Sequence, residues 1–372
     1  MGETVLITGG AGFIGSHLAD ALLADGRRVR VFDNLSEQVH GPDAGVPDYL
    51  AAEVEFIKGD VRDKDALRAA LDGVDAVVHL AAMVGVGQSM YQIDDYTAVN
   101  DLGTANLLQC LIDRPVKRLV VASSMSIYGE GLYKDAYGRL VDDASRAVDT
   151  LKRGQWEPVG EEGRPYEPVP TPETKRPELA SVYALGKYVQ ERMCLMVGQA
   201  YGIPTTALRF FNVYGTRQAL SNPYTGVLAI FASRLLNGKP PRIFEDGRQR
   251  RDFVHVTDVA RACMAALDRD AAAGRAINVG SGRIHTITEI AETLARTMGR
   301  GDIAPEITGE YRVGDIRHCF ADMTLAEEVL GFRPQVAFED GLAELVEWVA
   351  AQTAHDRVDD AARELRQRGL VA

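Results

Sequence analysis

Short, unbroken apolar runs alternate with helical patterns through the first half of the chain. Such runs are typical of strands that are buried on both faces of a parallel sheet. Between them, stretches such as 15–24 and 65–71 have the apolar spacing of helices. This alternation predicts an α/β fold with a doubly wound parallel sheet of the Rossmann type. The runs expected as strands are residues 5–8, 29–32, 54–57, 76–80, 119–122 and 206–211.

The pattern changes twice further along the chain. Residues of about 130–175, here called the insertion, are rich in Gly, Pro, Glu and Arg, and the prolines of 168–172 exclude a helix or a central strand. We expect a loop-rich segment with one short helix near 143–151. After about residue 215, helical patterns near 227–236, 256–267, 287–297 and 342–350 are separated by short strand candidates. This mixture predicts a smaller α/β lobe.

The predicted organisation has three parts. Residues 1–215 form the Rossmann domain with the insertion, and residues 216–352 form the smaller ligand-binding lobe, with sheet and helix segments crossing between the two. Residues 353–372 form a charged tail. A length of 372 residues with 46% hydrophobic and 25% charged positions suits such a globular chain.

Charge and cysteine content argue against several classes of partner and site. The formal net charge is −12 and no block of Lys and Arg interrupts it, so no nucleic-acid partner is expected. The four cysteines, at 110, 194, 263 and 319, lack paired spacing, so neither a metal site nor a disulfide framework is indicated. No apolar run approaches the ~18 residues of a membrane span, and no signal stretch precedes the first strand. We expect a cytoplasmic protein with no membrane partner.

A glycine-rich turn follows the first expected strand. Gly9, Gly12 and Gly15 fall as G-x-x-G-x-x-G, and Phe13 and Ile14 begin the helix behind them. Glycine lets the backbone turn tightly and approach a pyrophosphate, while the helix N-terminus offers free N–H groups. The position after a strand and before a helix predicts a dinucleotide site.

An aspartate at the end of the second strand selects the cofactor. Asp33 lies 18 residues beyond Gly15, where a carboxylate accepts hydrogen bonds from both ribose hydroxyls of NAD and repels the 2′-phosphate of NADP. Nearby arginines, at positions 27, 28 and 30, keep NADP as an alternative. The other expected cofactor contacts are Asn34, then Asp60 and Val61 at the third strand end, and Leu80, Ala81 and Ala82 at the fourth. His79 is interpreted as a packed histidine rather than a base.

A tyrosine and a lysine four residues apart supply candidate chemistry. Tyr183 and Lys187 share one face of a predicted helix, and Ser124 ends the fifth strand. Free tyrosine is a poor base at neutral pH, but a neighbouring ammonium and a cationic nicotinamide both favour the phenolate. Ser124 would share the hydrogen-bond network that carries the proton. These three residues are the predicted catalytic group.

These motifs together resemble the extended short-chain dehydrogenase/reductase superfamily, in its nucleotide-sugar epimerase/dehydratase branch. The likeness covers about residues 4–350. Besides the residues above it includes Asn100, Tyr128-Gly129 and the stretches 209–215 and 251–256. The resemblance implies NAD as cofactor, with Asn100 at its site, Tyr183 as base and Lys187 on the nicotinamide ribose. It also implies that Ser124 binds the sugar 4-hydroxyl, that Asn212, Arg251 and Arg312 hold the substrate diphosphate, and that helices after Asp94 and around 183–200 form a homodimer.

The residues after Ser124 bear on the net reaction. In the resembling dehydratases an Asp-Glu pair stands there, whereas this chain has Met125 and Ser126 beside the sugar, neither suited to acid–base work. A decarboxylase would also want a carboxylate. Removal of hydride, rotation of the 4-keto sugar and return of hydride to the other face remain, which is 4-epimerisation. An NAD(P)H-dependent 4-keto-sugar reductase and a catalytically silent dinucleotide sensor stay open.

The substrate is approached by resemblance alone. Residues 85–91, residues 218–224 and the insertion around 156–158 are similar to bacterial dTDP-L-rhamnose 4-epimerases. This implies a 6-deoxyhexose substrate, with a UDP-glucose or UDP-glucuronate type of 4-epimerase as the alternative. The insertion would either cover the sugar pocket or only decorate the surface.

Overall fold

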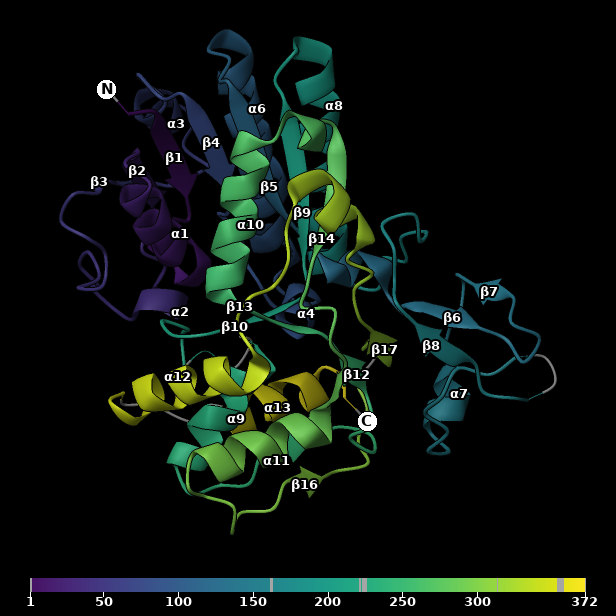
Figure 1. Cartoon of the computed structure of the whole chain (residues 1–372). Coiled ribbons are helices and arrows are strands. Elements are labelled where there is room, and N and C mark those ends of the chain that lie inside the picture. Colours follow the sequence, from purple (N-terminus) through teal and green to yellow (C-terminus); the bar gives the residue numbers. More distant parts are fainter. Residues whose placement is uncertain are drawn as a thin grey trace.

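A seven-stranded parallel sheet forms the larger part of the molecule (Figure 1). The computed structural model describes residues 2–160, 163–220, 222, 226–312, 314–352 and 358–371. All six strands expected from the sequence belong to this sheet, which confirms the predicted fold class. In spatial order its strands are β14 (Arg275–Val279), β9 (Thr205–Phe210), β5 (Arg118–Ser124), β4 (Ala76–His79), β1 (Thr4–Thr8), β2 (Arg28–Asp33) and β3 (Glu55–Lys58).

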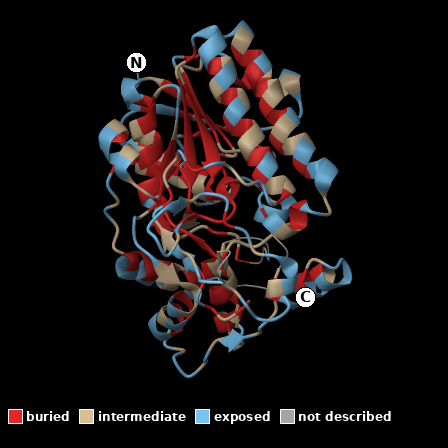
Figure 2. Ribbon diagram, turned by 90° about the vertical axis from the view of Figure 1, so that its right-hand side faces the viewer, coloured by how far each residue is buried: buried red, intermediate tan, exposed pale blue. Residues whose placement is uncertain are grey.

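Helices cover both faces of the sheet, and its strands are buried between them (Figure 2). Side chains alternate along a strand, so Val5 and Ile7 enter one core while Leu6 enters the other. This double burial explains why the strands are unbroken apolar runs. The covering helices are α1 (Phe13–Ala24) and α10 (Val256–Asp268) on the first face, and α3 (Lys64–Ala70), α6 (Gly103–Asp113) and α8 (Val182–Tyr201) on the second.

The chain returns to the large sheet after residue 215. Strand β14 pairs with β9 in parallel, and α10 packs against α1. Val259 and Cys263 of α10 are fully buried in the core that Val5 and Ile7 enter. The two parts are therefore joined by shared elements, because the chain passes from one to the other more than once.

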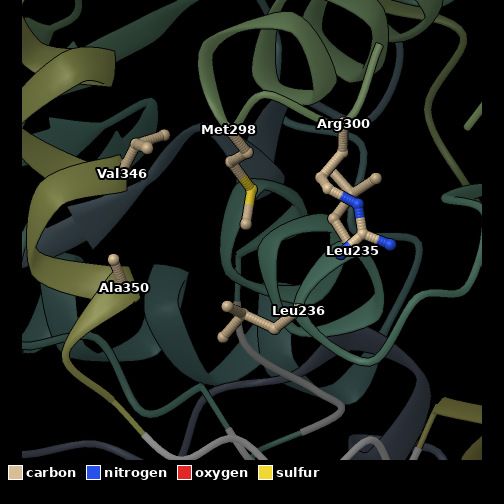
Figure 3. A pocket seen from close by; sticks show the side chains of 6 residues that line it. All are labelled: Leu235, Leu236, Met298, Arg300, Val346 and Ala350. Carbon is tan, nitrogen blue, oxygen red and sulfur yellow. The ribbon is translucent and has the colours of Figure 1, made fainter. Parts of the chain in front are cut away.

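A helical cluster forms the smaller lobe. Three helices pack around Leu228, Phe231, Leu294 and Leu345, all of which are buried. A cavity of about 120 Å³ lies between them, lined by Leu236, Met298 and four other residues, none of them a candidate site residue (Figure 3). The lobe comprises α9 (Val227–Leu236), α11 (Ile287–Thr297) and α12 (Phe338–Ala350), with short strands β10 (Asn212–Tyr214), β11 (Arg242–Ile243), β12 (Arg250–Arg251), β13 (Phe253–His255), β15 (His285–Thr286), β16 (Glu306–Ile307) and β17 (His318–Cys319).

The insertion folds into more regular structure than its composition indicates. It forms a three-stranded antiparallel sheet, and the strands stand apart from the main sheet (Figure 1). The strand that contains Pro168 lies at the edge of this sheet, where the missing N–H of proline interrupts no hydrogen bonds between strands. The expected helix is present but begins later, at Val148. The elements are β6 (Leu132–Lys134), β7 (Leu140–Val141), α7 (Val148–Leu151) and β8 (Glu167–Val169).

The last described segment, residues 358–371, packs onto both parts of the molecule. Its helix α13 (Val358–Gln367) binds the smaller lobe through Arg366, which contacts Glu310 at 2.6 and 2.8 Å. On the other side, the Tyr91 hydroxyl donates to Glu364 at 3.2 Å. The start of the predicted tail, 353–357, lies outside the described residues, as do Ser221 and 223–224 of the stretch 218–224.

The described residues show neither a membrane span nor a metal site. None of the helices there is both long and apolar enough to cross a membrane. Nor do three or more His, Cys, Asp or Glu side chains of that part of the chain gather as a metal site would require. All four cysteines are free and buried.

The short remaining helices and helical turns are α2 (Glu37–His40), α4 (Val86–Ser89), α5 (Ile93–Tyr96), 97–102, 125–128, 270–272 and 326–330.

Candidate active site

The glycine turn is packed too tightly for side chains. Gly9 has φ of +70°, and a Cβ there would lie 2.8 Å from the Ala81 nitrogen. A Cβ on Gly15 would lie 2.5 Å from the Gly10 Cα. Gly12 precedes α1 without a side-chain cap, so the first N–H groups of that helix stay available for an anion. The turn therefore fits the pyrophosphate of a dinucleotide.

We expect Gly15→Ala to weaken NAD binding by about 1–3 kcal/mol, because the methyl group forces the turn open. Gly45→Ala is the matched control, since Gly45 has no neighbour within 4 Å of its Cβ position. Titration calorimetry with NAD measures both variants. Equal affinities in the two would contradict this reading of the turn.

Asp33 is held at the mouth of this turn. One carboxylate oxygen accepts from the Ala11 N–H at 3.0 Å and the other from the Leu35 N–H at 2.9 Å. Each oxygen keeps a further lone pair for a ribose hydroxyl. Arg30, three residues before Asp33 in β2, is bound to Glu55 at 2.8 Å. Its place and its pairing remove it as a partner for a 2′-phosphate, which supports NAD over NADP.

Asn34 and Asp60 contact each other across two neighbouring strand ends. The Asn34 amide donates to Asp60 at 3.0 Å, and Arg62 donates to the same carboxylate at 2.8 and 2.9 Å. The hydrogen bond from Arg62 is the main reason that the pKa of Asp60 falls to about 2. Val61, beside Asp60, is buried against Gly103. This pair of strand ends forms a rigid, ionised edge next to Asp33.

Asn100 fixes the loop that follows β4. Its amide oxygen accepts from the Met83 N–H at 2.8 Å, and its amide nitrogen donates to the Met83 carbonyl at 3.1 Å. Both polar groups of the Asn100 side chain therefore bind the main chain directly after Leu80, Ala81 and Ala82. Asn100 shapes the cofactor side of this loop through the main chain.

His79 is a packed residue and no base. One ring nitrogen lies 2.7 Å from the Thr8 hydroxyl and the other 2.9 Å from the Thr104 hydroxyl. Burial, with a smaller effect of Lys187, lowers the pKa of His79 to about 3. The imidazole therefore stays neutral in the folded chain at pH 7.

This shift makes stability depend on pH. Below the ordinary pKa of 6.5 the unfolded chain binds a proton at His79 that the folded chain does not, so stability falls as pH falls. From pH 7 to pH 5 this histidine should cost about 2 kcal/mol of unfolding free energy. Urea unfolding at both pH values tests this: His79→Gln should lose less than wild type over the interval, and equal losses would contradict the assignment.

Ser124 and Tyr183 meet at the end of β5. Ser181 caps α8 by accepting from the Ala184 N–H at 3.1 Å, and the Tyr183 N–H donates to Ser89 at 3.0 Å. Ser124 accepts two hydrogen bonds from Ser126, at 2.9 and 3.2 Å, which leaves its own O–H to donate. Its side chain acts on the Tyr183 phenol in the direction that lowers the pKa of that group. A donor to the phenol oxygen favours the phenolate.

Lys187 differs from the sequence expectation in where its amine points. Its Nζ donates to the Gln190 side chain at 2.9 Å, and burial lowers the pKa of Lys187 to about 8. Burial also raises the pKa of Tyr183, against the smaller opposing effect of the Ser124 hydrogen bond. The protein by itself therefore does not lower the pKa of Tyr183 as the sequence analysis expected. A cationic nicotinamide beside the phenol would supply the missing positive charge.

A buried ion pair beneath the site was not expected from the sequence. Arg209 of β9 contacts Glu191 of α8 at 2.7 and 2.9 Å, and Ser123 donates to the same carboxylate at 2.7 Å. Arg209 also donates to the Tyr128 hydroxyl at 2.9 Å. These bonds fix α8 against β5 and β9. They hold Tyr183 at the strand ends.

The three residues expected at a diphosphate lie near one another. Asn212 is paired in register with Phe253, two residues from Arg251, and its buried amide oxygen has no hydrogen-bond partner. Arg312 contacts Asp315 at 3.1 Å, and Arg251 lies 3.9 Å from the same carboxylate. Burial alone would raise the pKa of Asp315, but its arginine neighbours hold that pKa below its ordinary value. Two cations therefore converge around one aspartate, and Asn212 lies on the strand paired with 253–255.

Comparison with known proteins adds to this geometry. The family model described as "NAD dependent epimerase/dehydratase family" matches residues 5–147 and 157–280. The chain is 35% identical to the dTDP-L-rhamnose 4-epimerase of Burkholderia thailandensis, over 94% of this chain and 96% of that one. It is 32% identical to a putative UDP-glucose 4-epimerase of Methanocaldococcus jannaschii, over 93% and 98%.

Solved structures of the same kind share the fold. The UDP-glucose 4-epimerase of Thermotoga maritima, solved with UDP-glucose, superposes with a TM-score of 0.76 at 31% identity, covering 93% of this chain and 98% of that one. That of Thermus thermophilus, solved with NAD, gives a TM-score of 0.73 at 32% identity, covering 94% and 100%.

Proposed function

Because the chain belongs to the NAD dependent epimerase/dehydratase family, we propose that it is a nucleotide-sugar 4-epimerase that acts on dTDP-L-rhamnose or a related 6-deoxyhexose. One observation carries the reaction type. Helix α8, which carries Tyr183, packs against β5 and the turn 125–128, where Ser124 is followed by Met125 and Ser126 rather than by carboxylates. This arrangement supplies one base and no second acid or base at that position.

Tyr183 takes the proton of the sugar 4-hydroxyl, and Ser124 binds the same hydroxyl and passes the proton along. NAD bound at the glycine turn and Asp33 would supply the hydride acceptor and donor for C4. Arg251, Arg312 and Asn212 hold the diphosphate, since arginine binds phosphate oxygens in a bidentate way. With the diphosphate held and the sugar free to turn about its bonds, hydride can return to either face of C4.

Other outcomes of C4 oxidation need groups that positions 125 and 126 do not provide. Dehydration requires an acid and a base beside C5 and C6, and neither a thioether nor an unactivated hydroxyl serves at neutral pH. The family also contains a UDP-N-acetyl-alpha-D-glucosaminuronate decarboxylase from Bacillus cytotoxicus, 30% identical to this chain. The residues after Ser124 favour epimerisation over both.

The choice of sugar rests on the side chain that follows Ser124. Met125 is buried and apolar beside the catalytic serine, which suits a methyl group better than a hydroxymethyl or carboxylate group. The relatives include UDP-glucose and UDP-glucuronate 4-epimerases at 28–34% identity, so these sugars are the main alternatives. An NAD(P)H-dependent 4-keto-sugar reductase is the second.

A substrate panel tests this proposal. Purified protein without added cofactor is incubated with dTDP-L-rhamnose, UDP-glucose and UDP-glucuronate, and proton NMR measures the initial rate of 4-epimer formation. We expect the highest kcat/KM with dTDP-L-rhamnose. A higher value with a UDP-sugar would reassign the substrate, and turnover only with added NADH or NADPH would replace the epimerase by a reductase.

We also propose a homodimer formed by α5 and α8 with the turn between α5 and α6. Large apolar side chains are exposed on these elements, namely Ile93, Leu102, Leu185, Met196 and Tyr201. Such side chains gathered on one helical layer are typical of an interface. Analytical ultracentrifugation should show a dimer for wild type and monomers for Leu185→Glu. A monomeric wild type would overturn this proposal.

A further inference from the structure

The segment 315–318 connects the insertion to the two arginines of the proposed diphosphate site. On one side, Asp315 binds Arg312 at 3.1 Å. Arg251 donates to the Arg317 carbonyl at 2.9 Å and to the Ile316 carbonyl. The direction of both guanidinium groups therefore depends on the path of this short segment.

The buried side chain of Arg317 is anchored by three carboxylates, of which Glu245 is buried while Glu157 and Asp246 are partly exposed. Arg317 is fully buried, and Glu157 of the insertion accepts from it at 2.6 and 3.0 Å. Glu245 and Asp246 of the smaller lobe accept at 2.9 and 2.7 Å. The other oxygen of Glu157 lies 2.8 Å from the His318 ring. Glu157 thus grips two consecutive residues of the segment.

The main chain of the segment is held from the insertion as well. Glu130 accepts from the Arg317 N–H at 2.9 Å and from the His318 N–H at 3.2 Å. Arg146 donates to the Asp315 carbonyl at 2.6 Å and is paired with Glu130 at 2.8 Å. Buried charge-assisted hydrogen bonds of this kind are strong and directional. The insertion therefore fixes both the side chain and the backbone of 315–318.

We propose that the insertion is a positioning device for the diphosphate site, and that Glu157 is a positioning residue that acts through Arg317 and the segment 315–318 on Arg251 and Arg312. The inference rests on the proposed function, because it assumes that these arginines take a nucleoside diphosphate. It gives the insertion a role different from a cover over the sugar and from surface decoration. The family model leaves residues 148–156, immediately before Glu157, unmatched.

The test compares Glu157→Ala with Glu157→Gln, which keeps an acceptor for Arg317. Glu167→Gln is the control, because Glu167 is exposed and belongs to the same insertion. Calorimetry on the NAD-loaded protein measures the Kd of UDP and of dTDP. We expect Glu157→Ala to weaken the better of the two by about tenfold or more, as for loss of a charge-assisted hydrogen bond. Glu157→Gln should fall between, and the control should match wild type.

Steady-state kinetics separates this role from others. Glu157→Ala should raise KM by a factor similar to its effect on Kd, with kcat at saturation nearly unchanged. Equal Kd values in wild type and both Glu157 variants would overturn the inference, and so would a fall in kcat with an unchanged Kd. If wild type itself binds neither UDP nor dTDP, the proposed function fails instead. Should Glu157→Ala not fold, Glu157→Gln alone decides by the same criteria.

Discussion

Replacing Tyr183 by Phe should reduce kcat by about a thousandfold, which corresponds to ~4 kcal/mol of transition-state stabilisation. The change removes only the phenolic oxygen, whose pKa the nearby Ser124 acts to lower. The ring and its packing remain, so NAD content and the Kd for nucleoside diphosphate should stay as in wild type. Single-turnover measurements with saturating substrate would give the rate directly.

Tyr188 provides the control for this variant. It lies on the same helix, is half-buried, and packs against the cluster of Met125 and Phe211. Tyr188→Phe should retain most of the wild-type rate. If Tyr183→Phe turned over at the wild-type rate, the assignment of the base would be wrong.

Replacing Lys187 by Met should lower kcat at pH 7 by about a hundredfold and move the pH–rate profile to higher pH. Burial already raises the pKa of Tyr183. If the Lys187 amine turns from Gln190 toward the phenol when NAD is bound, its charge favours the phenolate, and without that charge the active fraction at neutral pH falls. Because only the deprotonated tyrosine acts as base, the lost rate should return partly as pH rises. The same variant should bind NAD more weakly if Lys187 also holds the nicotinamide ribose.

Measurement of kcat from pH 6 to pH 10 in wild type and Lys187→Met tests this directly. Lys117→Met controls for loss of a lysine, because Lys117 is an exposed residue at the other end of β5, paired with Asp75. A uniform fall in rate with an unchanged profile would contradict pKa tuning and leave Lys187 a role in cofactor binding alone.

The central sheet could be predicted from the sequence because its strands carry a local signal. Val5, Leu6 and Ile7 are all buried, so an unbroken apolar run marks the strand whichever face each side chain enters. The seventh strand, Arg275–Val279, was expected only as one of the short strands between the helices of the C-terminal half and was not assigned to the large sheet. Its apolar stretch is short and follows a helix of the C-terminal half, so nothing local assigns it to the first sheet.

The insertion was harder to predict because its order comes from distant partners. Glu130 and Arg317 are separated by 187 positions, and their pairing leaves no periodic trace in the sequence. The strand Glu167–Val169 contains proline, and it forms because only one side of it must pair. Sequence reasoning therefore identified the segment as unusual without finding the ionic network that holds it.

The site residues also differ in how far their geometry could be predicted from the sequence. Gly9, Gly15 and Asp33 follow from spacing, because the turn and the strand end fix their geometry locally. The direction of the Lys187 amine does not follow from spacing. The amine binds Gln190, one turn along the helix, and the sequence does not show that it takes this direction rather than another. The partnership of Arg251 and Arg312 around Asp315 depends on how two loops of the smaller lobe meet. Roles assigned by resemblance to such residues needed a structure to bring them together.

The most direct test of the account is turnover in deuterated water. Purified protein without added cofactor is incubated with dTDP-L-rhamnose, and proton NMR follows the hydrogens at C4 and C5. If a hydride leaves C4 and returns within the same site, the 4-epimer appears with hydrogen retained at both carbons. Deuterium at C5 would show an enolising reaction such as dehydration or 3,5-epimerisation, and deuterium at C4 would show exchange with solvent; either result would contradict hydride transfer at C4 as the central step.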